Sequence, residues 1–367
     1  PISGPLPANA LIPGGAAVSY TWVFGTNNTG EVHFYCDASG QDANSGIYVN
    51  GILNATNSVI IETPAALTAS LIVPDPVTRY QVYEARMVVN NTGSAAAQNV
   101  TPSSIQLGGT GTTIRISGPV PASATIPGGG SAEFTWTYSA VGTGNITFAG
   151  SASGTDANSG EGKVSNNTNT SLTVQKQVNL SMNLTASPST ARTGSEITVI
   201  AAISNDTGSA TAQNVSVTPQ VLGLIQNGSN VVWDSGPSPA YVTLPGGSTQ
   251  YMTWTFGAGN SVGTVSFTGR AIGTDANAGW EVSGIDRESN EVAVETSANL
   301  ISSLSVSSQT VSAGQIITIY MSVTNNGGAE STSVNANSLV IYNEGTGNAL
   351  YSSGPQPSNV TLAPAGE

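Results

Sequence analysis

Apolar and polar residues alternate along most of the chain, in short segments separated by turns. Between Gly194 and Gly208, for example, every second position from Ile197 to Ile203 is apolar. Asn, Gly and Pro interrupt these segments roughly every 8–12 residues. A period of two is typical of strands with one buried face, and no segment of useful length has a helical period. The pattern predicts an all-β protein with almost no helix.

The sequence also repeats itself, with steps of 114, 118 and 118 residues between its Ser-Gly-Pro-x-Pro motifs. Four further landmarks follow in the same order in the first three copies: Pro-Gly-Gly, a Thr-Trp strand, Val/Ile-x-Phe and Asp-Ala-Asn-(Ser/Ala)-Gly. In the Thr-Trp strands, Trp22, Trp136 and Trp254 share a face with large apolar neighbours, so we expect them in hydrophobic cores. A unit of about 115 residues with these features predicts tandem immunoglobulin-like β-sandwich modules arranged in a rod.

The landmarks predict two complete modules in the middle of the sequence and half a module on each side of them. Two complete modules are predicted at residues 64–176 and 177–297. Residues 1–63 carry only the later landmarks, as the C-terminal half of a module, and residues 298–367 carry only the earlier ones, as an N-terminal half.

Half a sandwich leaves sheet edges unpaired and a core face open to water, so each end needs completion. Two alternatives remain open. The polypeptide continues as one tandem array, or the tail of one subunit completes the head of the next in a head-to-tail homopolymer. The second alternative has one difficulty: Ser353–Glu367 duplicates Ser3–Ala17, so two segments would compete for one slot.

The same landmarks carry a family resemblance. Together with Ala-Gln-Asn-Val at Ala97–Val100 and Ala212–Val215, they resemble the CARDB-type, cell-adhesion-related repeats over essentially the whole chain. Such repeats occur in tandem in large secreted and surface proteins of bacteria and archaea. The resemblance therefore implies an extracellular or cell-surface location, and it brings no catalytic residue with it.

Composition excludes several classes of function. Only 8% of residues are charged, and 8 Lys and Arg stand against 21 Asp and Glu, for a net charge of −13. Nucleic acids and anionic membranes require clustered cations, so neither is an expected partner. No apolar run approaches the roughly 20 residues of a membrane-spanning helix. Because the chain begins with Pro1 rather than Met, we expect a processed product or a part of something longer.

A single histidine and a single cysteine leave too few residues for recurring zinc sites, Ser-His-Asp triads or Cys-His dyads. We therefore expect no enzyme. Cys36 falls where the other copies have Gly150 and Gly269 and is expected to be buried, whereas alternation places His33 facing outward. Glu84 and Arg86 fall on positions expected to face inward, which predicts a β-bulge, a one-residue register change or a contact with a neighbouring subunit.

The Asp-Ala-Asn-(Ser/Ala)-Gly landmark places carboxylate and amide oxygens two residues apart, as calcium loops do. An EF-hand-type loop would need a glutamate at its twelfth position, which counted from Asp156 is Asn167. An Asx turn explains the same residues and is favoured, so no cofactor is required. If calcium binds, the expected ligands are Asp42, Asn44, Asp156, Asn158, Asp275 and Asn277.

Two kinds of surface site are also candidates. Trp233 and Trp280 have no aromatic counterparts in the other copies and could contact a glycan or a surface ligand. Asn-x-Ser/Thr sequons for N-glycosylation are only mildly more frequent than the composition alone predicts. They occur at Asn27, Asn54, Asn90, Asn99, Asn145, Asn166, Asn169, Asn179, Asn183, Asn205, Asn214, Asn227 and Asn359.

The sequence thus favours a non-catalytic extracellular structural protein, a rod of sandwiches forming a surface filament, stalk or adhesin. Few charges mean little ionic hydration to remove when rods pack side by side, so lateral bundling is expected. One alternative is a glycan- or surface-binding adhesive module on the same fold. Another is a set of accessory repeats from a secreted hydrolase whose catalytic domain lies outside this sequence.

Overall fold

A computed structural model describes residues 1–364, which form β-strands, turns and connecting segments. Within these residues there is no helix, and the predicted all-β class with immunoglobulin-like sandwiches is confirmed. None of the described residues therefore forms a helix long and apolar enough to cross a membrane. The chain divides into two compact units, Pro1–Val174 and Gln175–Glu367.

The first unit contains a complete sandwich whose core residues run from Ala65 to Val174. One layer is the sheet β14-β16-β11-β9, and facing it are the sheets β10-β20-β17-β13 and β15-β12-β18-β19. Its strands are β9 (Leu67–Ile72), β10 (Val77–Thr78), β11 (Val82–Asn91), β12 (Ala97–Pro102), β13 (Gln106–Gly109), β14 (Thr112–Val120), β15 (Ala124–Ile126), β16 (Ser131–Gly142), β17 (Gly144–Gly150), β18 (Ala152–Asp156), β19 (Gly162–Val164) and β20 (Thr168–Gln175).

The second unit contains a complete sandwich of the same plan, with core residues from Val178 to Val294. The sheet β21-β23-β27-β25 faces the sheet β22-β31-β28-β24-β26, whose strand β28 also pairs with β29 and β30. Its strands are β21 (Leu180–Ser187), β22 (Thr190–Arg192), β23 (Glu196–Asn205), β24 (Ala212–Asn227), β25 (Val231–Ser238), β26 (Val242–Leu244), β27 (Thr249–Ala258), β28 (Gly263–Asp275), β29 (Glu281–Ser283), β30 (Arg287–Glu288) and β31 (Val292–Glu295).

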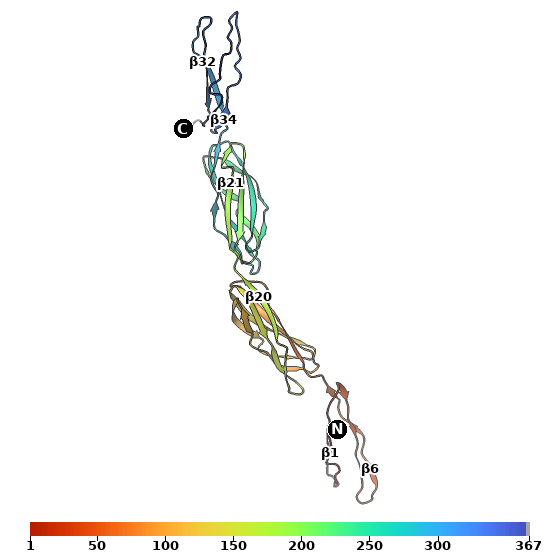
Figure 1. Ribbon diagram of the computed structural model, residues 1–367. Helices are drawn as coiled ribbons and strands as arrows, with labels where there is room; N and C mark the ends of the chain where they lie inside the picture. Colours follow the sequence, from red (N-terminus) through yellow and green to blue (C-terminus); the bar gives the residue numbers. More distant parts are fainter. Residues whose placement is uncertain (365–367) are drawn as a thin grey trace. The chain divides into compact units, whose positions relative to one another are not determined.

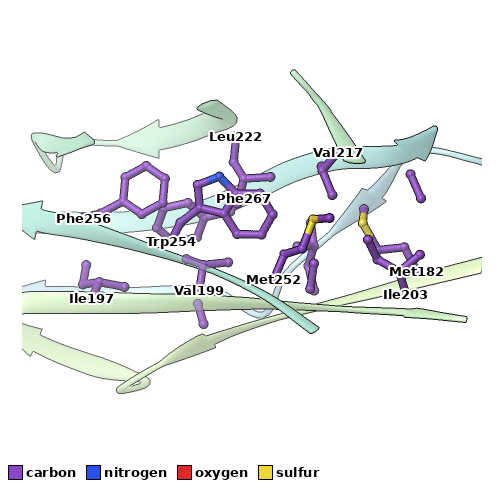
Figure 2. Close-up of a cluster of buried hydrophobic side chains, with 14 of the residues drawn as sticks. Met182, Ile197, Val199, Ile203, Val217, Leu222, Met252, Trp254, Phe256 and Phe267 are labelled. Carbon is purple, nitrogen blue, oxygen red and sulfur yellow. The ribbon is translucent and has the colours of Figure 1, made fainter. Parts of the chain in front are cut away.

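The core of the second sandwich is built around Trp254, which is fully buried. Alternation along β27 places Met252, Trp254 and Phe256 on one face, and Figure 2 shows this row against Phe267 of the facing strand β28. The ring centroids of Phe256 and Phe267 are 4.6 Å apart. Trp254 Nε1 donates a hydrogen bond to the carbonyl oxygen of Gln220 (2.9 Å), so burial leaves no polar atom of the indole unpaired.

A buried asparagine fixes the loop that carries the chain from one sheet to the other. Asn205 Nδ2 donates to the carbonyl oxygens of Ala210 (2.8 Å) and Leu244 (3.0 Å). In the first sandwich Asn91 Nδ2 does the same for Ala95 (2.8 Å) and Ile126 (3.2 Å). The loop is therefore one residue shorter after Asn91 than after Asn205.

This difference in loop length corrects the expectation for Glu84 and Arg86. Counted back from Asn91, both lie on the outer face of β11, where they are exposed, and the β11–β16 register runs without a bulge. Arg86 forms ion pairs with Glu84 (2.8 Å) and with Glu133 on the adjacent strand (3.6 Å). The predicted bulge or register change is thus wrong, because the extra residue lies in the loop and not in the strand.

The two end segments form only two-stranded sheets, β1-β2, β3-β8, β4-β7 and β5-β6 in residues 1–63, and β32-β33 and β34-β35 in residues 298–364 (Figure 1). Their strands are β1 (Ser3–Leu6), β2 (Thr21–Val23), β3 (Gly30–Val32), β4 (Tyr35–Cys36), β5 (Ser39–Gln41), β6 (Tyr48–Asn50), β7 (Asn54–Ala55), β8 (Val59–Ile61), β32 (Leu300–Val306), β33 (Ile319–Asn325), β34 (Ser331–Val334) and β35 (Val360–Leu362).

We expect Trp254→Ala to lower the free energy of unfolding of the second sandwich by about 3–5 kcal/mol, because the cavity left at its centre cannot collapse fully. Urea denaturation followed by circular dichroism measures the change. Trp233→Ala is the matched control in the same sandwich: its side chain is 46% exposed, and it should change stability by about 0.5 kcal/mol or less. Equal losses in the two variants would contradict the assignment of Trp254 to the core.

Candidate functional site

Residues 1–63 present an apolar face that no other described residue covers. Trp22, Phe24 and Phe34 are 40%, 46% and 37% exposed, whereas their counterparts in both sandwiches are at most 2% exposed. Trp22 was expected in a core and is exposed here, because strands β9 to β13 of the first sandwich have no counterparts within residues 1–63. Its place in the core of a complete module stays a prediction. We call Tyr20, Trp22, Phe24, Val32 and Phe34 the N-terminal face.

Residues 298–364 present the complementary half of a core. Along β33 and the segment before it, Ile317, Ile319 and Met321 are 40%, 40% and 44% exposed. Counted from the asparagine that ends each strand, their counterparts in β23 are Ile197, Val199 and Ala201, which are fully buried. Residues 298–364 contain no counterparts of strands β16 to β20, which belong to the half of the first sandwich that covers these positions. We call the following residues the C-terminal face: Leu300, Leu304, Ile317, Ile319, Met321, Val323, Leu339 and Ile341.

In the Ser-Gly-Pro-x-Pro motif, the backbone of the glycine lies directly against the strand that carries the tryptophan. In the second sandwich a Cβ on Gly236 would lie 2.7 Å from the Cα of Trp254, and φ at Gly236 is +101°, so only glycine fits. Gly4 has the same relation to Trp22, with a Cβ contact at 2.8 Å and φ of +110°. Strand β1 therefore pairs with β2 as in a complete module, although residues 1–63 contain no counterparts of the earlier strands β9 to β13.

The Asp-Ala-Asn landmark forms an Asx turn in the first sandwich. Asp156 is 3% exposed, and its Oδ1 accepts hydrogen bonds from the backbone N–H groups of Asn158 (3.0 Å) and Ser159 (2.8 Å) and from Ser159 Oγ (3.0 Å). Its Oδ2 accepts a hydrogen bond from the backbone N–H of Ala65 (2.7 Å). These bonds, led by that from Ala65, lower the pKa of Asp156 from 3.8 to about 2.

The candidate calcium ligands take part in the hydrogen bonds of the turn. Both carboxylate oxygens of Asp156 accept backbone hydrogen bonds, and Asn158 Nδ2 donates to Glu62 Oε2 (2.8 Å). Asn277 Nδ2 likewise donates to Gln175 Oε1 (2.8 Å), beside Asp275. Among residues 1–364, no three His, Cys, Asp or Glu side chains form a group able to hold a metal ion. Calcium binding through the Asp and Asn oxygens stays a prediction.

The corresponding turn also forms at Asp42, with the same internal hydrogen bonds. Its Oδ1 accepts from the backbone N–H groups of Asn44 (3.0 Å) and Ser45 (2.7 Å) and from Ser45 Oγ (2.8 Å), and these bonds, led by that from the Ser45 N–H, lower the pKa of Asp42. Asp42 is exposed, unlike the buried Asp156 and Asp275. A residue corresponding to Ala65, which bonds Oδ2 in the first sandwich, does not exist within residues 1–63.

Cys36 also lies in this incomplete region and is exposed, so its expected burial in a complete module stays a prediction. Its counterpart Gly150 is buried against Met87 and Ile105, neither of which has a counterpart in residues 1–63. His33 does face outward, with its side chain 45% exposed and Nε2 3.7 Å from Glu31 Oε1.

The two unmatched tryptophans lie in different parts of the second sandwich. Trp233 lies in β25 and pairs with Phe256 of β27, whereas Trp280 precedes β29 and accepts a hydrogen bond from the backbone N–H of Asp275 at its carbonyl oxygen (2.8 Å). Trp233 is exposed and Trp280 is half-buried. Within the described part of the chain, no ring contact joins them, so a ligand-binding role for this pair stays a prediction.

Among the sequon asparagines, Asn205 is corrected as a glycosylation candidate. It is 2% exposed, and its Nδ2 donates to two buried carbonyl oxygens, so a glycan there would remove both bonds and has no room. Asn166 uses its side-chain amide to bond both the N–H (2.9 Å) and the C=O (3.1 Å) of Ala69 on the edge strand β9. The remaining sequons stay predictions.

No protein-family model matches the chain, and no curated protein matches it. Among solved structures it is similar to FdeC, an Escherichia coli adhesin, with a TM-score of 0.28, 13% identity and coverage of 72% of this chain and 75% of that chain. A structure named BspA_C_mut gives a TM-score of 0.22, 10% identity and coverage of 63% and 99%. Escherichia coli alpha-2-macroglobulin activated by porcine elastase gives a TM-score of 0.23 and 11% identity, with coverage of 75% of this chain and 30% of that chain. Similarity at this level carries no argument about function, and the CARDB-type resemblance stays a prediction.

The lowered pKa of Asp156 makes its contribution to stability dependent on pH. The contribution is complete above the unfolded-state pKa of 3.8 and is lost as the pH falls through the folded-state value of about 2. We therefore expect Asp156→Asn to lower the urea midpoint of unfolding at pH 7, and the difference from the unaltered protein to shrink between pH 4 and pH 2. A difference that is constant over this range would contradict the assignment.

Proposed function

We propose that this chain is a non-catalytic extracellular structural protein, a series of immunoglobulin-like sandwiches that forms part of a surface filament, stalk or adhesin. The observation that carries the proposal is the tandem repeat: two complete sandwiches of the same plan follow each other along the chain, and residues 1–63 and 298–364 contain parts of further copies.

Two further features support the proposal: few residues are suited to catalysis, and the modules have well-packed cores. A single histidine and a single cysteine provide little for acid–base or nucleophilic catalysis, and both lie in the incomplete module. The two complete sandwiches each have one continuous apolar core with buried aromatic side chains. Independently folded modules in series transmit tension and set distances, which is the mechanical role that we assign to them.

The location can be tested on intact cells of the native source. We expect antibodies raised against the second sandwich (residues 178–294) to label the outside of unpermeabilised cells in immunogold electron microscopy. Antibodies against a cytoplasmic protein provide the control for membrane integrity. Labelling that appears only after permeabilisation would overturn the extracellular assignment.

Lateral bundling is a separate part of the proposal. Only 8% of residues are charged, so hydroxyl and amide groups dominate the polar surface and little ionic hydration opposes side-by-side contact. We expect fibres of this protein to associate into bundles that persist between about 50 mM and 1 M salt, because screening acts mainly on ionic contacts. Negative-stain electron microscopy at both salt concentrations measures this, and single fibres at both would contradict it.

A further inference from the structure

We infer that the second sandwich binds a short neutral oligosaccharide in the hollow between residues 181–183 of its edge strand β21 and residues 286–288. This binding activity goes beyond the proposed structural role, and it lies wholly within one complete module. The hollow has a volume of about 590 Å³, which is within the range typical of small-molecule sites. Strands β21 and β23 form its floor, and residues 286–288 form its wall.

The hollow opens at a position where the first sandwich is closed. There the side-chain amide of Asn166 bonds both the N–H and the C=O of Ala69, and so caps the edge strand β9. Ala69 pairs with the residue two before Asn91. Its counterpart is Met182 of β21, which pairs with the residue two before Asn205. The repeat thus identifies the backbone of Met182 as the edge position that the first sandwich caps with an amide.

The second sandwich lacks this cap because Ile285 stands in the place of Asn166. Ser165 and Gly284 precede these two residues, and each donates its N–H to the carbonyl oxygen four residues before the landmark aspartate (2.8 Å). The Ile285 side chain is 66% exposed and forms no hydrogen bonds. The side chain of Met182 lies in the core, so it is the backbone of this residue that lines the hollow.

Both ends of this open edge are closed, which decides what can enter. A Cβ on Gly284 would lie 2.9 Å from the carbonyl oxygen of Leu180, so the chain passes directly against the first end. At the second end, Asn290 bonds the N–H (2.9 Å) and the C=O (3.0 Å) of Ala186. A peptide strand added to β21 would have to continue past both points. A short oligosaccharide is compact enough to lie between them.

The groups around the hollow match the hydroxyls of a saccharide. At an edge position the N–H and C=O of Met182 face the same side, so one sugar hydroxyl can accept from the N–H while its neighbour donates to the C=O. Ser181 and Asn183 face outward on β21 and provide a further hydroxyl and an amide. From the wall, Asp286 can accept and Arg287 can donate. Donors and acceptors thus alternate around the site, as they do around a sugar.

The wall of the hollow is held in place by the facing sheet. Arg287 and Glu288 form β30, which pairs with Thr268 and Gly269 of β28, and Ser266 Oγ donates a hydrogen bond to Glu288 Oε1. Residues 286–288 carry two carboxylates against one guanidinium. Like charges placed together are unfavourable, so this wall favours a neutral saccharide over an acidic or phosphorylated one.

An aromatic ring stands beside the floor of the hollow. Asn183, Ala202 and Tyr251 form one outward-facing row across β21, β23 and β27. The small side chain of Ala202 keeps the floor low, and Tyr251 is 60% exposed. In the first sandwich the same row has Val88 and Glu133 in place of the alanine and the tyrosine. A sugar that lies over Ala202 can therefore place its apolar face against the Tyr251 ring only in the second sandwich.

The test titrates neutral tetrasaccharides of glucose, mannose or galactose into the full-length protein by isothermal titration calorimetry. The protein comes from a host without N-glycosylation, because Asn183 lies in a sequon. We expect at least one of the three to bind with a Kd of about 1 mM or below. Ile285→Asn restores the amide cap of the first sandwich and should weaken this binding by about tenfold or more. The matched control Ile285→Ala leaves the edge open and should bind as the unaltered protein does.

A second pair of variants tests the aromatic ring. Tyr251→Ala should weaken the binding by about threefold or more, because the sugar loses its apolar contact. Tyr241→Ala is the matched control: its side chain is 62% exposed, it does not line the hollow, and its loss should leave the affinity unchanged. Equal effects of the two tyrosine variants would contradict the placement of the sugar over Ala202.

Three results would overturn the inference. The first is no binding of any of the three tetrasaccharides up to about 10 mM. The second is equal affinity of Ile285→Asn and Ile285→Ala. The third is an N-linked glycan on Asn183, found by peptide mass spectrometry of the protein from its native source, because such a glycan would fill the hollow. None of these results changes the surface labelling of cells, which tests the proposed function separately.

Discussion

The fold depends on covering one tryptophan strand in each module. Apolar burial contributes about 25 cal/mol per Å², and the rows around Trp136 and Trp254 contain the largest side chains of each core. Both rows are covered by strands from the first and second halves of the same repeat. The strand that carries Trp22 has the same sequence pattern but only one of these halves, and its ring is exposed. The same tryptophan is therefore buried where both halves of its repeat are present and exposed in residues 1–63, which contain only one half.

The polar groups of the module follow the same division. Asn91, Asn205 and Asn325 each donate a hydrogen bond to a backbone carbonyl group in the loop that follows their own strand. Because both partners belong to the N-terminal half of a module, this bond is present even in residues 298–364. Asp156 and Asp275 instead join the two halves, since their turn belongs to the later half and their Oδ2 bonds the first strand. The asparagine stabilises a half-module, whereas the aspartate bonds fully only in a whole module.

How much the sequence predicts depends on how local each feature is. Alternation and the repeat predict the strands and the sandwich class, because both are set by neighbours along the chain. The predicted alignment of Glu84 and Arg86 with the other copies was wrong by one residue. The loop after Asn91 is one residue shorter than the loop after Asn205, and the motifs alone do not reveal this difference. The exposure of Trp22 and Cys36 depends on strands that lie far along the chain in the complete modules. The bond from Ala65 to Asp156 spans 91 residues and has no sequence signature.

Within each complete module, strand pairs, an aromatic core and the bond from the first strand to Asp156 or Asp275 hold the two halves together. Separating the two halves of a complete module would therefore require unfolding the domain. Because apolar packing and backbone hydrogen bonds supply this stability, it needs few charges, in keeping with a chain in which only 8% of residues are ionisable as Asp, Glu, Lys or Arg.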